Sequence, residues 1–170
     1  MQRFALTAAI TLLAGCSSEP PAPVAAPDSI EQVDAAAVPE EVAAVAQATL
    51  PGFTITEAER KERDGRVYYD VEGRRADGVE TELDMLQTET GWRVVEVQRD
   101  IDWAEAPAYV RDVAARAQGA FDPVRVIEST QTEDGAVIYE LFAAGRPEAP
   151  SMEVRVFEGR AEVLAAANPH

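Results

Sequence analysis

Residues 64–71 read DGRVYYDV, and the same pattern returns at residues 134–141 as DGAVIYEL. Asp-Gly indicates a tight hairpin turn, because glycine readily adopts the positive φ angle that such turns require. The residues that follow alternate in character, as in a strand with one buried face. In the first copy we expect Val67, Tyr69 and Val71 to face the core and the residues between them to face away.

The similarity extends to both sides of these hairpins. Residues 39–46, PEEVAAVA, are matched by residues 107–114, PAYVRDVA, and residues 82–86, ELDML, by residues 153–157, EVRVF. Each of the first two segments opens with proline, which suits the first turn of a helix, and carries apolar residues at helical spacing. Further Gly-containing turns separate short strand-like runs, as expected for antiparallel hairpins.

These patterns predict an α+β fold of two tandem repeats. Each repeat is expected to hold one helix and about four antiparallel strands, with the helices packed on one face of the sheet. We place the repeats at residues 39–103 and 104–170. The last strand of the second repeat is the weakest, because residues 165–167 are alanines and form helices more readily than strands.

The proline-initiated helix, the Pro-Gly break at residues 51–52 and the two Asp-Gly hairpins resemble the PepSY-like family of small bacterial envelope domains. The resemblance covers residues 39–166. It implies a fold similar to that of a beta-lactamase inhibitory protein built from tandem helix-plus-sheet repeats, which binds its target through the sheet. The second repeat departs from the pattern at residues 119–123, which read GAFDP.

The first residues are typical of an exported protein. Arg3 precedes an uncharged, mostly apolar run over residues 4–14, which is shorter than the 20 or so residues of a membrane-spanning helix. Residues 13–16, LAGC, resemble the bacterial lipobox, in which the cysteine is acylated. We therefore predict a signal peptide at residues 1–15 and a membrane anchor through lipid on Cys16. An ordinary signal peptide before a free cysteine is the alternative.

The segment after Cys16 is rich in Pro, Ala and Ser, and we expect residues 16–38 to form the lipidated cysteine and a flexible tether. A short helix over residues 29–37 is the alternative, since alanine forms helices well. Ser17, in place of an aspartate, favours the outer membrane facing the periplasm, by resemblance to the sorting rule of enteric bacteria. The expected location is thus the cell envelope.

Composition excludes several classes of function. The chain has 31 acidic and 15 basic residues, so it repels phosphate backbones and we expect no nucleic-acid partner. The single histidine is the terminal His170, and Cys16 is the single cysteine, so Ser-His or Cys-His catalysis and Cys/His zinc sites lack their residues. No phosphate-binding glycine loop and no calcium-loop motif is present. We predict no enzyme, no cofactor and no metal, although counting alone leaves a catalytic carboxylate pair open.

Four large side chains are candidates for a binding surface on the sheet face away from the helices: Tyr68, Trp92, Ile138 and Phe142. The alternative is that Ile138 and Phe142 pack under a loop or under the tether. The leading hypothesis is a non-catalytic module that binds an envelope protein or peptide through this face. Two other hypotheses remain. One is a structural or stress-related envelope lipoprotein without a discrete ligand, and the other is a weak cation or small-ligand sensor.

Overall fold

The computed structural model describes residues 29–147 and 149–164. The predicted signal peptide, Cys16, the first part of the predicted tether and residues 165–170 lie outside the described residues. Within the described part of the chain, no helix has the length and apolar character needed to span a bilayer.

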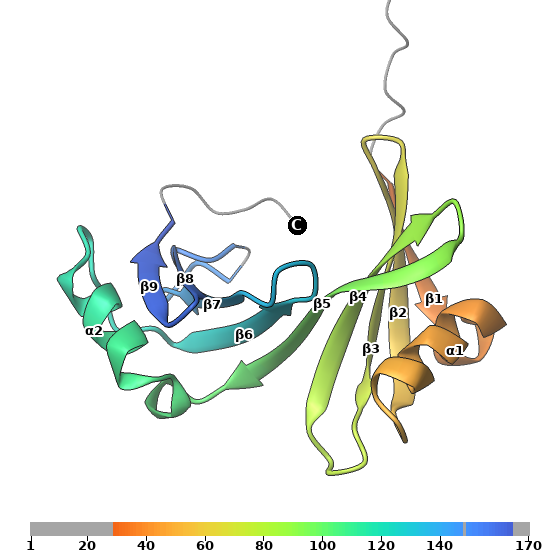
Figure 1. The fold of residues 1–170 in the computed structure, drawn as a ribbon, viewed down its shortest axis with the longest axis horizontal. Coiled ribbons are helices and arrows are strands. Elements are labelled where there is room, and N and C mark those ends of the chain that lie inside the picture. The colour runs from red at the N-terminus through yellow and green to blue at the C-terminus, as the bar shows by residue number, and fades with distance from the viewer. Residues whose placement is uncertain (1–28, 148, 165–170) are drawn as a thin grey trace, which may run out of the picture.

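The described chain folds into one nine-stranded antiparallel sheet with two short helices (Figure 1). Each strand is hydrogen-bonded to the strand that follows it in the sequence. The strands are β1 (Ser29–Asp34), β2 (Thr54–Arg63), β3 (Arg66–Arg74), β4 (Glu80–Thr88), β5 (Gly91–Ile101), β6 (Arg125–Gln131), β7 (Val137–Phe142), β8 (Met152–Phe157) and β9 (Arg160–Val163). The helices are α1 (Glu40–Thr49) and α2 (Ala108–Arg116), and the 3-10 turns are η1 (Ala35–Ala37) and η2 (Trp103–Glu105).

The predicted α+β fold of two tandem helix-plus-four-strand repeats is wrong. The molecule is dominated by a single sheet, and strand β5 is the reason. It is 11 residues long, and it pairs with β4 over Gly91–Gln98 and with β6 over Glu96–Ile101. Because the β5–β6 ladder joins all strands into one sheet, the hydrogen bonding does not divide the chain into two units.

The predicted tether also needs correction. Residues 29–34 form β1, which pairs with β2 from Ser29 opposite Glu62 to Asp34 opposite Glu57, and η1 follows directly. The backbone groups of β2 would otherwise be an open sheet edge, so the ladder supplies the hydrogen bonds that this polar segment lacks on its own. Neither a flexible tether nor a helix describes residues 29–34.

The hairpin expected at residues 64–65 is confirmed. Asp64 and Gly65 have φ angles of 52° and 73°, and Arg63 lies opposite Arg66 across the two-residue turn. Two consecutive positive φ angles are the mark of a type I′ turn, whose twist matches that of the flanking strands. The turn therefore fixes the register of β2 and β3, and with it the face on which each side chain of β3 lies.

Both helices cover the same face of the sheet. Pro39 and Pro107 are the N-caps of α1 and α2, so each helix begins at the residue after the expected proline. Helix α1 buries Val42 and Ala46 against one core cluster, which includes Tyr69, Val71, Leu83 and Met85. Helix α2 buries Val110 and Ala114 against a second, which includes Val126, Tyr139, Leu141 and Val154.

The sheet is strongly bent between these clusters. In Figure 1 the helices lie on the outer sides of the two halves, so the helix-free face is the inner side of the bend. The cross-strand row Leu83–Val97–Thr130–Val137 runs along the helix side through both halves. The residues that alternate with this row therefore lie on the inner face.

Gly73 of β3 lies where Phe53 and Thr54 pack tightly against the strand. A Cβ atom there would be 2.4 Å from the carbonyl oxygen of Thr54 and 2.6 Å from the nearest ring atom of Phe53. Phe53 is 1% exposed, so its ring is held by the first core cluster. Glycine is required at this position because no side-chain atom fits.

Candidate functional site

Two rows of carboxylates cross the inner face of the sheet. The first runs from Glu59 through Asp70 and Asp84 to Glu96, each residue opposite the next on the neighbouring strand. The second runs from Glu57 through Glu72 to Glu82, and then meets Gln98. We call these seven acidic residues the carboxylate rows. Like charges directly opposite each other destabilise a sheet, so this arrangement needs an explanation.

Lysine and glutamine side chains interact with some of these carboxylates. The ammonium of Lys61 forms ion pairs with Asp70 and, at 3.3 Å, with Glu59. The amide of Gln98 donates to Oδ2 of Asp84 at 3.3 Å and to Oε2 of Glu96 at 2.6 Å. These contacts fix the orientation of the carboxylates, but a neutral amide cannot balance their charge.

Burial makes the crowding of charge more costly. Asp70 and Glu96 are 8% and 4% exposed, and Asp84 is 9% exposed. Burial, followed by the charges of Asp70 and Glu72, raises the pKa of Glu82 to about 7. Burial and the charges of neighbouring carboxylates likewise raise the pKa of Asp84 well above its ordinary value. Glu82 therefore favours a bound proton or another cation near neutral pH.

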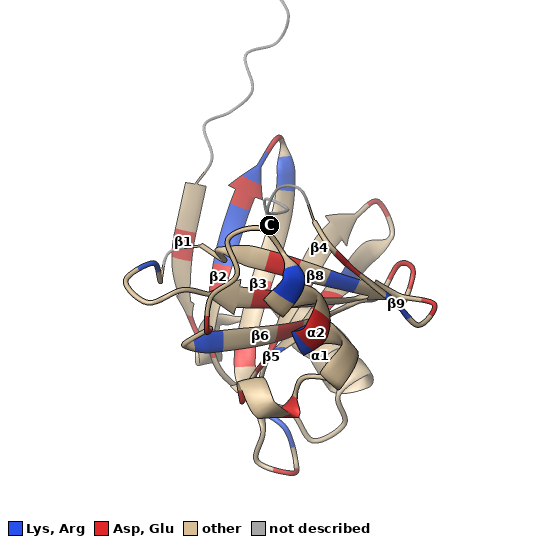
Figure 2. Cartoon of the chain, turned by 90° about the vertical axis from the view of Figure 1, so that its left-hand side faces the viewer, with Lys and Arg blue, Asp and Glu red and all other residues tan. Residues whose placement is uncertain are grey.

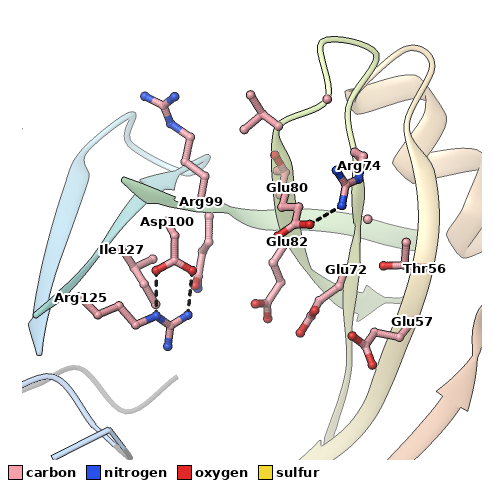
Figure 3. A pocket seen from close by; sticks show the side chains of 15 residues that line it. Thr56, Glu57, Glu72, Arg74, Glu80, Glu82, Arg99, Asp100, Arg125 and Ile127 are labelled. Carbon is pink, nitrogen blue, oxygen red and sulfur yellow. Dashed lines mark hydrogen bonds and ion pairs between the residues drawn. The ribbon is translucent and has the colours of Figure 1, made fainter. Parts of the chain in front are cut away.

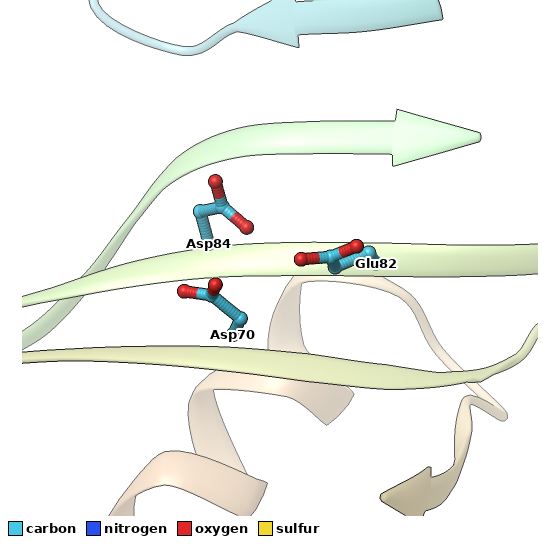
Figure 4. A group of neighbouring side chains, drawn as sticks. All are labelled: Asp70, Glu82 and Asp84. Carbon is cyan, nitrogen blue, oxygen red and sulfur yellow. The ribbon is translucent and has the colours of Figure 1, made fainter. Parts of the chain in front are cut away.

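Three of these side chains converge. Asp70, Glu82 and Asp84 each offer a carboxylate oxygen, and these oxygens lie within 4.8 Å of one another (Figure 4). Oδ1 of Asp84 is buried and accepts no hydrogen bond from the described residues. Among the described residues, this cluster is the one group of His, Cys, Asp or Glu side chains with the spacing of a metal site.

An open groove of about 530 Å³ runs beside the carboxylate rows, over strands β2 to β6 (Figure 3). Glu57, Glu72 and Glu82 point into it from three neighbouring strands. At its ends, Arg74 pairs with Glu80, and Arg125 makes a two-pronged ion pair with Asp100 at 2.7 and 3.0 Å. The groove is thus walled by carboxylates, with arginines that already have acidic partners at both ends.

The predicted binding residues do not form one exposed surface. Ile138 and Phe142 are 3% and 5% exposed, and the guanidinium of Arg125 lies 5.3 Å from the centre of the Phe142 ring. Strand β7 is buried on both faces, so its inner residues are not available to a partner. Tyr68 is on the inner face as expected and is half-buried.

Trp92 lies on the opposite face from the one predicted. Its ring packs edge-on against Tyr69, with ring centres 5.1 Å apart, beside the first core cluster. The cause is a β-bulge. Asp84 faces Glu96 while Met85 faces Val94, so Val95 is an extra residue that reverses the alternation along β5.

The carboxylate rows were not predicted as a site. In the sequence, the alternation of Glu82 and Asp84 along one strand is the pattern of a solvated face. They are instead opposed by acids on both neighbouring strands, because Asp70 and Glu96 lie directly across from Asp84. Only the register of three strands reveals this arrangement. Figure 2 shows acidic residues along the strands of both halves, with fewer basic residues among them.

No protein-family model matches this chain, and no curated protein and no solved structure is similar enough to match it. The resemblance to the PepSY-like family therefore stays a prediction.

Proposed function

We propose that the chain is a cell-envelope lipoprotein, anchored through lipid on Cys16, whose folded part is a non-catalytic module that binds a cationic segment of an envelope protein or peptide. The observation that carries the binding role is the pair of carboxylate rows beside an open groove. The lipobox-like residues 13–16 support the anchor. The acidic groove takes the place of the exposed aromatic face that the sequence suggested.

Charge complementarity supports a cationic partner. Glu57, Glu72 and Glu82 enter the groove from adjacent strands, so their negative potentials add. Burial and the neighbouring Glu57 raise the pKa of Glu72, so an additional positive charge beside this carboxylate would favour its ionised form. A lysine or arginine side chain of a partner would supply that charge and would also favour rapid association.

The groove is open, so a side chain or short segment of a partner can enter it. Five strands contribute to its lining, and its volume lies within the range of roughly 300–1,000 Å³ that is common for ligand sites. Its described lining includes no Ser, Cys or His, the residues that most often act as nucleophile or base.

Replacing Glu57 and Glu72 together by glutamine is expected to weaken binding of a fluorescent lysine-rich peptide about tenfold at low salt. Both side chains line the groove, and a tenfold loss corresponds to about 1.4 kcal/mol. Fluorescence anisotropy with the purified full chain measures the change. Binding to the unsubstituted chain should also weaken as salt rises from about 20 to about 200 mM, because exposed charges are then screened.

A matched control is Glu41→Gln, which removes an exposed acid from helix α1 on the other face of the sheet. It should leave peptide affinity unchanged. Equal binding of lysine-rich and neutral peptides, or an equal loss in the Glu41 variant, would contradict the groove as the binding site. For the anchor, the intact mass of the mature chain is expected to show residues 1–15 removed and lipid on Cys16.

A further inference from the structure

We propose that Asp70, Glu82 and Asp84 form a binding site for a divalent cation of the size of Ca²⁺ beside the groove. This proposal does not depend on the peptide-binding role, because the ion needs no partner protein, although Glu82 also lines the groove. It uses the cluster drawn in Figure 4, in which the three carboxylates approach one another from β3 and β4.

The spacing of the oxygens fits calcium. Ca²⁺ binds oxygen at about 2.3–2.6 Å, so two ligands on opposite sides of the ion are separated by about 5 Å. One oxygen of each residue lies within 4.8 Å of the others, so all three can reach one ion without a change in the backbone. Because Asp70 and Asp84 are opposite each other in the ladder, two rigid strands hold them in place.

The second observation is the unpartnered oxygen of Asp84. This residue is 9% exposed, and its Oδ1 accepts no hydrogen bond from the described residues, although Oδ2 accepts one from Gln98. Figure 4 shows one Asp84 oxygen turned toward β5, which carries Gln98, and the other toward Glu82 and Asp70. A buried carboxylate oxygen without a partner is costly, and a cation between the three residues would satisfy it.

The local charge matches a divalent ion. Lys61 forms ion pairs with both Asp70 and Glu59, so the three carboxylates keep a net charge between two and three negative charges when the acids are ionised. Lys61 and Gln98 would act as supports that orient the ligands, as in many metal sites.

The donor set and the access route favour calcium over other metals. All three donors are carboxylates, which select hard cations over zinc or copper. Glu82 lines the groove, so an ion can enter with part of its water shell and keep those waters as further ligands. Ca²⁺ accepts such irregular mixtures of carboxylates and water, whereas Mg²⁺ requires a near-ideal octahedron at about 2.0–2.1 Å.

The test is titration of the purified full chain with calcium chloride alone, at about pH 8 in about 150 mM NaCl so that ionic strength stays constant. We expect heat of binding that saturates in the range of about 0.1 to 1 mM and a rise in melting temperature of about 3–8 °C. Magnesium should produce a weaker response at the same concentration.

The variants Asp84→Asn and Glu82→Gln distinguish a metal site from general screening of an acidic protein. Each should lower calcium affinity at least tenfold while raising the melting temperature in calcium-free buffer, because each removes one of the crowded negative charges. Glu41→Gln on α1 should keep the full calcium response. A substitution that only perturbs the structure is not expected to lower calcium affinity and at the same time raise the melting temperature in calcium-free buffer.

The proposal is overturned if calcium up to about 10 mM, well above the affinity range of extracellular sites, gives neither heat nor a change in melting temperature. It is also overturned if both variants keep the response of the unsubstituted chain. If Asp84→Asn does not fold, Glu82→Gln and Asp70→Asn carry the comparison. The lysine-rich peptide is absent from this experiment, so failure of the peptide-binding proposal would leave its outcome unaffected.

Discussion

Acidification from about pH 8 to about pH 5 is expected to increase the free energy of unfolding by about 2 kcal/mol. The pKa of Glu82 is raised from 4.5 to about 7 in the folded state, first by burial and then by Asp70 and Glu72. Between these two values the folded chain holds a proton that the unfolded chain has released. Stability is therefore greatest toward the lower value and decreases as the pH rises through the folded pKa.

Neighbouring groups act in the same direction. Burial raises the pKa of Asp70 despite its ion pair with Lys61, and it raises the pKa of Asp84 more strongly. One pKa unit corresponds to about 1.4 kcal/mol, so even a partly screened Glu82 accounts for the expected change. Urea unfolding followed by circular dichroism at several pH values, in calcium-free buffer, measures it.

The variant Glu82→Gln separates this effect from the general charge of the protein. It should be more stable than the unsubstituted chain by about 1–2 kcal/mol at about pH 8, and its stability should depend less on pH. Glu41→Gln, on the exposed surface of α1, should reproduce the original pH dependence. A stability that rises with pH between about 5 and 8 would show that the carboxylate rows do not carry unbalanced charge.

Gly73→Ala is expected to destabilise the fold by about 3 kcal/mol or more. Its methyl group would lie 2.4 Å from the carbonyl oxygen of Thr54 and 2.6 Å from the Phe53 ring. Neither can move cheaply, because the oxygen belongs to the backbone of β2 and the ring is buried in the core. The midpoint of urea unfolding should fall accordingly.

Gly78→Ala is the matched comparison. Gly78 has a φ angle of 88°, and a Cβ atom there would meet nothing within 4 Å. Its substitution should cost about 1 kcal/mol, from backbone conformation alone. Equal losses in the two variants would mean that the contact around Gly73 does not constrain the fold.

The sequence predicts local structure where a single residue type decides it. Asp64 and Gly65 form the expected hairpin because few residues tolerate two positive φ angles in succession. The prolines before α1 and α2 locate the helix starts, and Tyr69 is buried as the alternation of apolar residues indicated. These features depend on neighbours in the chain and not on distant strands.

The remaining features depend on contacts between distant residues. The single sheet results from β5 pairing with both β4 and β6, which no local pattern records. The bulge at Val95 reverses the side-chain alternation, so an uninterrupted count places Trp92 on the wrong face. Asp84 is buried and has an acid directly opposite on each neighbouring strand, and a hydrophobicity pattern contains neither fact.

Strands β1 and β9 are the outermost strands of the described sheet, and they affect whether the sheets of separate molecules can pair. Strand β9 is only four residues long, and β1 carries Glu31 and Asp34 along its length. Short or charged edge strands disfavour hydrogen bonding between the sheets of separate molecules. In the proposed lipid-anchored form, these edge strands would disfavour edge-to-edge pairing of neighbouring copies.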